Sequence, residues 1–337
     1  MRATAASRYA DHGHIHLETT SGPVSRRVTG PSHWTSMAIL LAAVQRGRGM
    51  LQALAAMAMV GGAVTASTYL TDYPHYTAQA VRYVVATGLL VAFGRRARSS
   101  RIRRPVGVEW WWLIASATAG LTAYNLAVLR AVGHAEPAVV GTIVACVPLV
   151  LALAALLAKR GRAPIAVFAA AVVVVVGAVT VVGGGRANVS GVAWSLVALA
   201  GEAGFTLLAV PVLARLGPFS VATHTTWIAA SQLLVLAVAA DRGRALMMPD
   251  IGVVLAVVCL VVLTAAAFVL WFMAVEVIGG ALAGLAAGII PVAAAVSGLV
   301  VGVTTVNARV ALGTVLVACG IAGGLAAAGR AERACLR

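Results

Sequence analysis

Glu202 is the side chain in this sequence with the clearest capacity for chemistry. It lies in the middle of an apolar run, LAGEAGFTLL, between Gly201 and Gly204. A carboxylate at membrane depth is costly unless it is paired, solvated or protonated, and such residues usually mark a substrate or proton pathway. The functional hypothesis is that Glu202 binds a solute or carries a coupled proton. The structural alternative is that it pairs with a hydroxyl group or an arginine of a neighbouring helix.

Other polar side chains also interrupt apolar runs. Arg82 could bind a carboxylate of a solute, pair with Glu202 or extend its charge to the lipid headgroups. Glu276 is a further candidate, although an acid at the end of its helix could simply face water. Amide, aromatic and imidazole groups often line small-molecule sites, but each also serves as a helix–helix contact. The candidates of this kind are Tyr124, Asn125, His224 and Trp271.

Two central prolines belong to an internal duplication. One constant offset, without a gap, matches Pro148 to Pro291, and the same offset matches four further identical pairs: Ala131 and Ala274, Val132 and Val275, Gly141 and Gly284, Gly177 and Gly320. Proline removes a backbone donor and kinks a helix. At bilayer depth such a defect is tolerated where it is buried in protein or lines a wet cavity. The pattern therefore predicts a paired break beside the solute path, with an ordinary packing kink as the alternative.

The elements that carry these residues are membrane-spanning. The mean hydropathy is +0.97 and 10% of residues are charged, whereas charged residues make up about a quarter of a soluble domain. The formal charge of +15 comes from arginines in short segments between apolar runs. Charge in such loops orients a membrane protein, so we expect no nucleic-acid partner.

Ten apolar runs are close to the length of about 20 residues that crosses the hydrocarbon. We expect helices over 51–70, 77–94, 108–130, 138–158, 164–184, 191–212, 220–240, 251–273, 281–301 and 310–328. With both termini cytoplasmic, nineteen of the 25 Lys and Arg residues fall inside and five outside, and Arg82 lies within a span. This asymmetry follows the positive-inside rule. Because five is odd, two five-helix repeats must lie inverted in the membrane.

The expected organisation has four parts. Residues 1–49 form a polar, disordered cytoplasmic tail, 50–186 the first repeat, 187–330 the second repeat, and 331–337 a cytoplasmic C-terminal tail. The tail's apolar run, Met37 to Val44, is too short to cross a bilayer and lacks the order of a signal peptide. The alternative is that synthesis starts at Met37 or Met50, so that most or all of residues 1–49 are not made.

The order of these segments resembles the drug/metabolite transporter superfamily, in particular EamA-type permeases. YPHYTAQAVRYVVATGLLVAF is similar to the family's second helix, and LRAVGHAEPAVVGTIVACVPLVLALAALLA to its third and fourth. In the second half, GEAGFTLLAVPVLARLGP resembles the sixth helix and AFVLWFMAVEVIGGALAGLAAGIIPVAAAVSGLVVG the eighth and ninth. The resemblance covers about 51–329. Many members carry a glutamate about a dozen residues after each central proline, where this chain has Arg160 and Val303.

Motifs for catalysis are lacking. The sequence has no GxxxxGK[ST] loop, HExxH or GxSxG, and its four cysteines are scattered, so we expect no catalytic residue, cofactor or metal. We expect an all-α polytopic permease of the cell membrane that moves a small organic solute by alternating access, with export implied by the resemblance. Proton coupling and a homodimer are further expectations. A membrane-embedded enzyme acting on lipid or isoprenoid substrates and a non-transporting scaffold are the alternatives.

Overall fold

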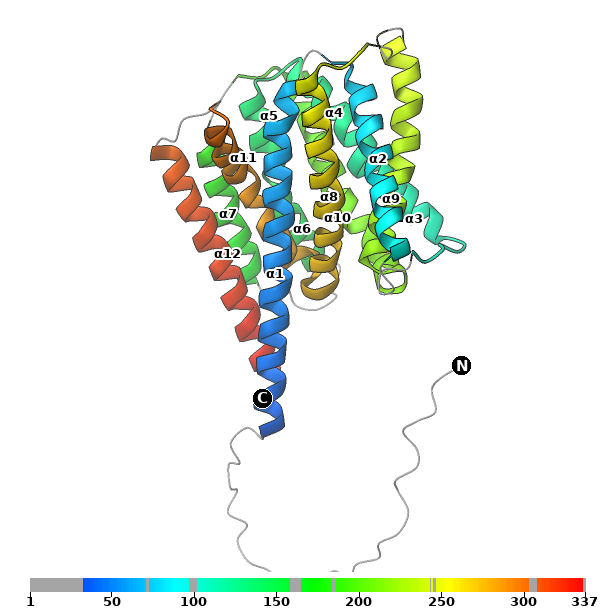
Figure 1. Ribbon diagram of the computed structural model, residues 1–337. Helices are drawn as coiled ribbons and strands as arrows, with labels where there is room; N and C mark the ends of the chain where they lie inside the picture. Colours follow the sequence, from blue (N-terminus) through cyan, green and yellow to red (C-terminus); the bar gives the residue numbers. More distant parts are fainter. Residues whose placement is uncertain are drawn as a thin grey trace, which may run out of the picture.

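The protein is a bundle of long helices (Figure 1). The computed structural model describes residues 33–70, 73–96, 102–157, 165–183, 186–242, 244, 247–302 and 308–335. The first repeat contains α1 (His33–Ser67), η1 (Thr68–Leu70), α2 (His75–Arg96), α3 (Glu109–Ala117), η3 (Thr118–Ala123), α4 (Tyr124–Val132), α5 (Pro137–Val144), α6 (Val147–Leu157) and α7 (Ile165–Val182). The second contains α8 (Val189–Leu216), α9 (Pro218–Leu236), η4 (Ala237–Asp241), α10 (Ile251–Leu285), η6 (Ala286–Gly288), α11 (Ile289–Val300) and α12 (Ala308–Cys335).

The helices of the described residues are consistent with ten membrane crossings. Nine helical stretches are apolar and long enough to span a bilayer, and one of them, Ile251–Val300, has 50 residues. At about 1.5 Å per residue it would be about 75 Å long, far more than the hydrocarbon thickness of about 30 Å. Gly279 divides it, with φ 75° and ψ 158°, a backbone conformation that favours glycine. The predicted all-α polytopic membrane fold is confirmed, and division of the long stretch at Gly279 brings the nine apolar stretches of the described residues into agreement with ten helices.

The two halves of the bundle are inverted copies. The offset that relates Pro148 to Pro291 also relates the first residue of α2, His75, to the first residue of α9, Pro218. It likewise takes the start of α7 to the start of α12. The backbone N–H of Thr77 donates to Asp241 Oδ2 at 2.7 Å, so the start of α2 lies beside the end of the α9–η4 helix. These equivalent helices are therefore antiparallel.

The fourth helix of each repeat is interrupted next to its proline. In the first repeat, helix α5 ends at Val144 and α6 starts at Val147, just before Pro148. In the second, the 3-10 turn η6 precedes Pro291. The two interrupted helices pack on each other, since a Cβ added at Gly284 would lie 2.8 Å from Leu151 Cδ1. The break predicted from the paired prolines is present in both copies.

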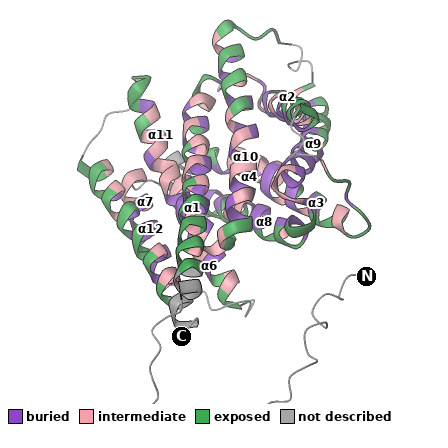
Figure 2. Cartoon of the chain, turned by 60° about the horizontal axis from the view of Figure 1, so that its bottom comes forward, coloured by how far each residue is buried: buried purple, intermediate pink, exposed green. Residues whose placement is uncertain are grey.

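The inner and outer faces of the helices differ in how far their residues are buried. Figure 2 shows buried residues gathered where helices face one another and exposed residues on the outer faces. Many of those outer side chains are large and apolar, including Val235, Val238 and Leu255. An apolar outer surface of this extent is suited to lipid, because soluble monomers rarely expose large contiguous apolar patches.

The N-terminal part of α1 differs from the sequence expectation. The helix begins at His33, so residues 33–49 are helical and do not belong to an unstructured tail. The run from Met37 to Val44 is rich in Leu and Ala, which favour helix, and it continues directly into the first span. Residues 1–32, the rest of the expected tail, lie outside the described residues. The start of α1 and the end of α12 lie at the same end of the bundle (Figure 1).

Candidate functional site

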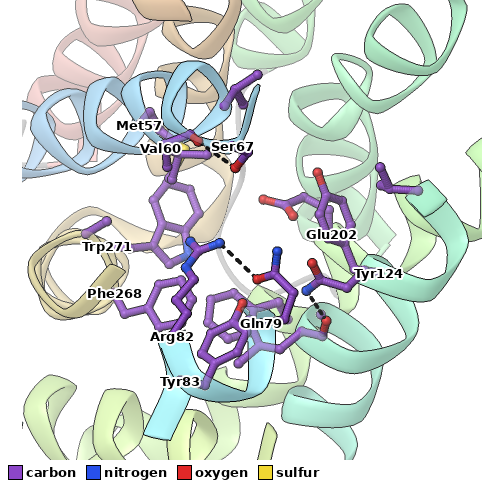
Figure 3. A pocket seen from close by; sticks show the side chains of 18 of the residues that line it. Met57, Val60, Ser67, Gln79, Arg82, Tyr83, Tyr124, Glu202, Phe268 and Trp271 are labelled. Atoms are coloured by element: carbon purple, nitrogen blue, oxygen red, sulfur yellow. Dashed lines mark hydrogen bonds between the residues drawn. The ribbon is translucent and has the colours of Figure 1, made fainter. Parts of the chain in front are cut away.

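A cavity of about 290 Å³ lies between the two repeats. Its walls come from α1, α2, η3, α4, α8 and α10 (Figure 3). Most of the lining is apolar or aromatic, with a few polar groups, as is usual for a small-molecule site. Five of the residues singled out from the sequence line it: Arg82, Tyr124, Asn125, Glu202 and Trp271.

Glu202 reaches this cavity because its helix approaches η3 closely. A Cβ added at Gly201 would lie 2.6 Å from the carbonyl oxygen of Ala119, and one at Gly204 would lie 3.3 Å from Ala119 Cβ. The side chain of Glu202 is half-buried and its carboxylate points into the cavity (Figure 3). Within the described part of the chain this carboxylate has no hydrogen bond or ion pair. A carboxylate that has left bulk water without a partner is a strong attractor for a cation or a proton.

Arg82 lies on the opposite wall and is held by other groups (Figure 3). Its Nε donates to Thr264 Oγ1 at 2.5 Å, and its Nη1 donates to Gln79 Oε1 at 3.2 Å. The guanidinium also lies over the ring of Tyr83, 5.3 Å from the centroid. The ion pair with Glu202 considered from the sequence is not formed in this structure, so the cavity holds an acid and a base on separate walls.

Aromatic rings close the side of the cavity next to α10. The ring of Phe205 lies 5.2 Å from that of Phe268 and 5.1 Å from that of Phe272. Trp271 Nε1 donates to Thr206 Oγ1 at 3.0 Å, which fixes the orientation of the indole. Because tilted ring pairs at these distances are favourable, the wall is a rigid apolar surface for the body of a solute.

The duplication runs through the cavity itself. Three pairs of residues that line it are related by the offset that links Pro148 to Pro291. These pairs are Tyr124 and Ala267, Asn125 and Phe268, and Val128 and Trp271. Equivalent faces of α4 and α10 therefore line the same cavity, so the cavity lies on the pseudo-twofold axis that relates the repeats.

The other four residues singled out from the sequence lie elsewhere. Pro148 is buried and Pro291 half-buried in the interrupted helices, and neither lines this cavity. Those helices pack beside α7 and α12, and a place for the prolines beside the solute path stays a prediction. Glu276 is exposed and lines a different cavity.

His224 holds two segments of the chain together through hydrogen bonds. Its Nδ1 accepts from Trp227 Nε1 at 3.0 Å, which leaves Nε2 to donate to the carbonyl oxygen of Arg103 at 3.0 Å. Both ring nitrogens are thus engaged in holding the segment before α3 against α9. Nothing in this arrangement brings the imidazole to the central cavity.

Sequence reasoning missed two polar residues of α2 that line the cavity. His75 and Gln79 lie on the same helix face as Arg82, at helical spacing, and all three contribute to the lining. His75 Nε2 is buried without a hydrogen-bond partner in the described structure. The spacing from Arg82 was the available signal, although it gave no reason to prefer this face over the others.

Comparison with known proteins gives a family and a fold. Residues 47–183 match the model of the EamA-like transporter family. A crystal structure titled only as that of a protein superposes with a TM-score of 0.71 at 21% identity, covering 83% of this chain and 97% of the other. At that identity the likeness shows the fold alone, but it extends over both repeats. No curated protein sequence matches the chain.

Proposed function

We propose that this chain, which belongs through residues 47–183 to the EamA-like transporter family, exports a small organic solute bearing a cationic group. The observation that carries this proposal is the carboxylate of Glu202, which lies in a cavity between the repeats and has no hydrogen bond or ion pair among the described residues. A cationic group is the natural partner for that carboxylate, and the wall of Phe205, Phe268 and Trp271 suits an apolar body. The family consists of membrane transporters, which favours transport over the enzyme and scaffold alternatives.

The proposed mechanism is alternating access. Inverted repeats place a solute site between them, and rocking of one repeat against the other exposes it to each side in turn. The sequence contains no phosphate-binding loop of the GxxxxGK[ST] type, and we propose that a proton gradient drives export. Glu202 would then alternate between a proton and the solute, since one carboxylate cannot hold both cations at once. We place the protein in the cell membrane with both termini in the cytoplasm.

The test is substitution of the carboxylate. Cells expressing wild type, Glu202→Gln or an empty vector are compared for intracellular and extracellular solutes, at matched levels in the membrane. We expect a cationic or zwitterionic solute to move outward with wild type and to revert to the vector level with Glu202→Gln. In proteoliposomes, the wild-type flux of that solute should depend on pH and the residual flux of the variant should not.

A matched control distinguishes the specific role of Glu202 from a general effect of removing one negative charge from the protein. Glu136→Gln makes the same chemical change at an exposed residue away from the cavity and should transport like wild type. Equal flux and equal pH dependence in wild type and Glu202→Gln would contradict the role of the carboxylate. A wild-type profile identical to that of the vector, across hosts of different metabolism, would contradict transport of such solutes.

A further inference from the structure

A second cavity, of about 1030 Å³, lies between α1, α2, α9 and α10. It is lined near the last turns of α2, by Leu89, Leu90 and Phe93, and by Pro218 and Phe219 at the start of α9. It is therefore at the opposite end of α2 from His75 and distinct from the central cavity. Leu89, Phe93 and Val262 on its rim are exposed. Exposed apolar side chains at this depth face acyl chains, so the cavity opens towards the bilayer.

Its polar groups face one another across α1 and α10. Arg48 and Gln52 lie on one face of α1 together with Gln45, at spacings of three and four residues. Glu276 lines the cavity from α10. The two helices touch at this level, because a Cβ added at Gly49 would lie 2.6 Å from Ile278 Cγ2. Cation, anion and amide thus surround the polar end of a largely apolar space.

None of these groups is satisfied within the described chain. Arg48 and Glu276 are exposed and make no hydrogen bond or ion pair there, with each other or with a third residue. Gln52 Oε1 is buried without a donor. A buried acceptor left unpaired costs free energy that a bound donor would recover. A ligand that matches all three groups would bring an N–H donor to Gln52 and Glu276, and an anionic group to Arg48.

We propose that this cavity binds one molecule of a phosphatidylethanolamine from the adjacent leaflet. Its phosphate would face Arg48, its ammonium would donate to Glu276 and Gln52 Oε1, and its acyl chains would leave along Leu89, Phe93 and Val262. A phosphatidylcholine has the same charges but no N–H to donate. A phosphatidylglycerol has the phosphate but no cation for Glu276. The site is independent of the solute that the central cavity carries.

Native mass spectrometry of the purified protein tests this assignment. The protein is equilibrated with mixtures of phosphatidylethanolamine, phosphatidylcholine and phosphatidylglycerol that have identical acyl chains. We expect one phosphatidylethanolamine to be retained about tenfold more strongly than the other two lipids. This is the change in affinity expected when a ligand lacks one hydrogen bond to a charged group. Stepwise N-methylation of the headgroup should weaken retention as the N–H donors disappear. This series uses only the wild-type chain, so it does not depend on how any variant folds.

Variants then place the site. Gln52→Leu and Glu276→Gln should each reduce the preference for phosphatidylethanolamine, while Glu136→Gln, an exposed acid elsewhere, should keep it. Equal retention of phosphatidylethanolamine and phosphatidylcholine by wild type would overturn the proposal. Strongest retention of phosphatidylglycerol would also overturn it, because the site would then recognise only the phosphate and not the ammonium group. So would a preference that survives in both cavity variants.

Discussion

At the scale of single residues, the orientation of Arg82, on the cavity wall opposite Glu202, is fixed by its hydrogen-bond partners. Arg82 is oriented by Thr264 and Gln79, and Thr264 is buried. A guanidinium held from two directions presents its remaining N–H groups in a fixed geometry. We infer that Thr264 positions Arg82 for an anionic group of a zwitterionic solute, although it does not line the cavity itself.

The variant Thr264→Val tests this positioning role. Valine has nearly the same shape but cannot accept from Arg82 Nε, so the guanidinium gains freedom to leave the cavity wall. We expect the KM for a zwitterionic solute to rise by about tenfold, as for a lost hydrogen bond to a charged group, with membrane levels and kcat little changed. Flux measured in proteoliposomes against solute concentration checks it. Thr314→Val removes a similar hydroxyl, bonded to its own helix in α12, and an equal rise there would contradict the role.

At the scale of elements, the glycines of the duplication hold α7 against α12. A Cβ added at Gly177 would lie 2.7 Å from the backbone nitrogen of Val317, and one at Gly320 would lie 2.9 Å from that of Val174. The two glycines are equivalent in the repeats, as are the two valines. Small residues allow transmembrane helices to approach this closely, where packing drives their association. This pair of contacts gives the repeated glycines a structural reason that sequence alone did not supply.

Alanine at these positions should therefore weaken the bundle. We expect Gly177→Ala and Gly320→Ala each to cost about 1–3 kcal/mol through overpacking and to lower the thermal unfolding midpoint of the purified protein. Gly323→Ala is the matched control on the same helix, since its Cβ would meet nothing within 4 Å. Alanine there should be neutral or slightly stabilising, because it is the better helix former. The same loss of stability at all three positions would argue against close helix packing as the cause.

The sequence predicted helices and their pairing better than it predicted the cavity. Hydropathy and the constant offset were sufficient to predict ten helices and two inverted repeats, because these features depend on local composition and on the order of segments along the chain. Glu202 was recognisable since acids are rare and costly in apolar runs. The prolines were equally recognisable as breaks, but the direction in which a broken helix faces depends on packing. For the same reason the helical spacing of His75 and Gln79 from Arg82 did not show that this face of α2 lines the cavity.

At the scale of the whole molecule, contacts between the repeats occur at both ends of the bundle. At one end Asp241 accepts from the backbone and hydroxyl of Thr77. At the other, Arg215 at the end of α8 pairs with Glu109 at the start of α3. The central cavity is lined from the middle of the helices up to Ser67 and His75, so it extends towards the first of these ends. The Glu109–Arg215 pair lies at the other end, which no residue lining this cavity reaches, and we infer that this end is closed.

Removing that pair should shift the molecule away from this conformation. A cysteine replaces Val64, which lines the cavity, in a chain whose four native cysteines are serines, and intact cells are treated with a membrane-impermeant maleimide. With the His75 end outside, we expect labelling of this cysteine, slowed by about twofold to fivefold in Glu109→Gln. A surface ion pair is weak, and the shift in population can be no larger than the difference it makes between the two states. Glu136→Gln breaks only a long, exposed contact with Arg186, 3.9 Å apart, and should leave the rate unchanged. If Glu109→Gln labels as fast as its parent, the pair does not hold the closed end; if only inverted vesicles label, the cavity faces the cytoplasm.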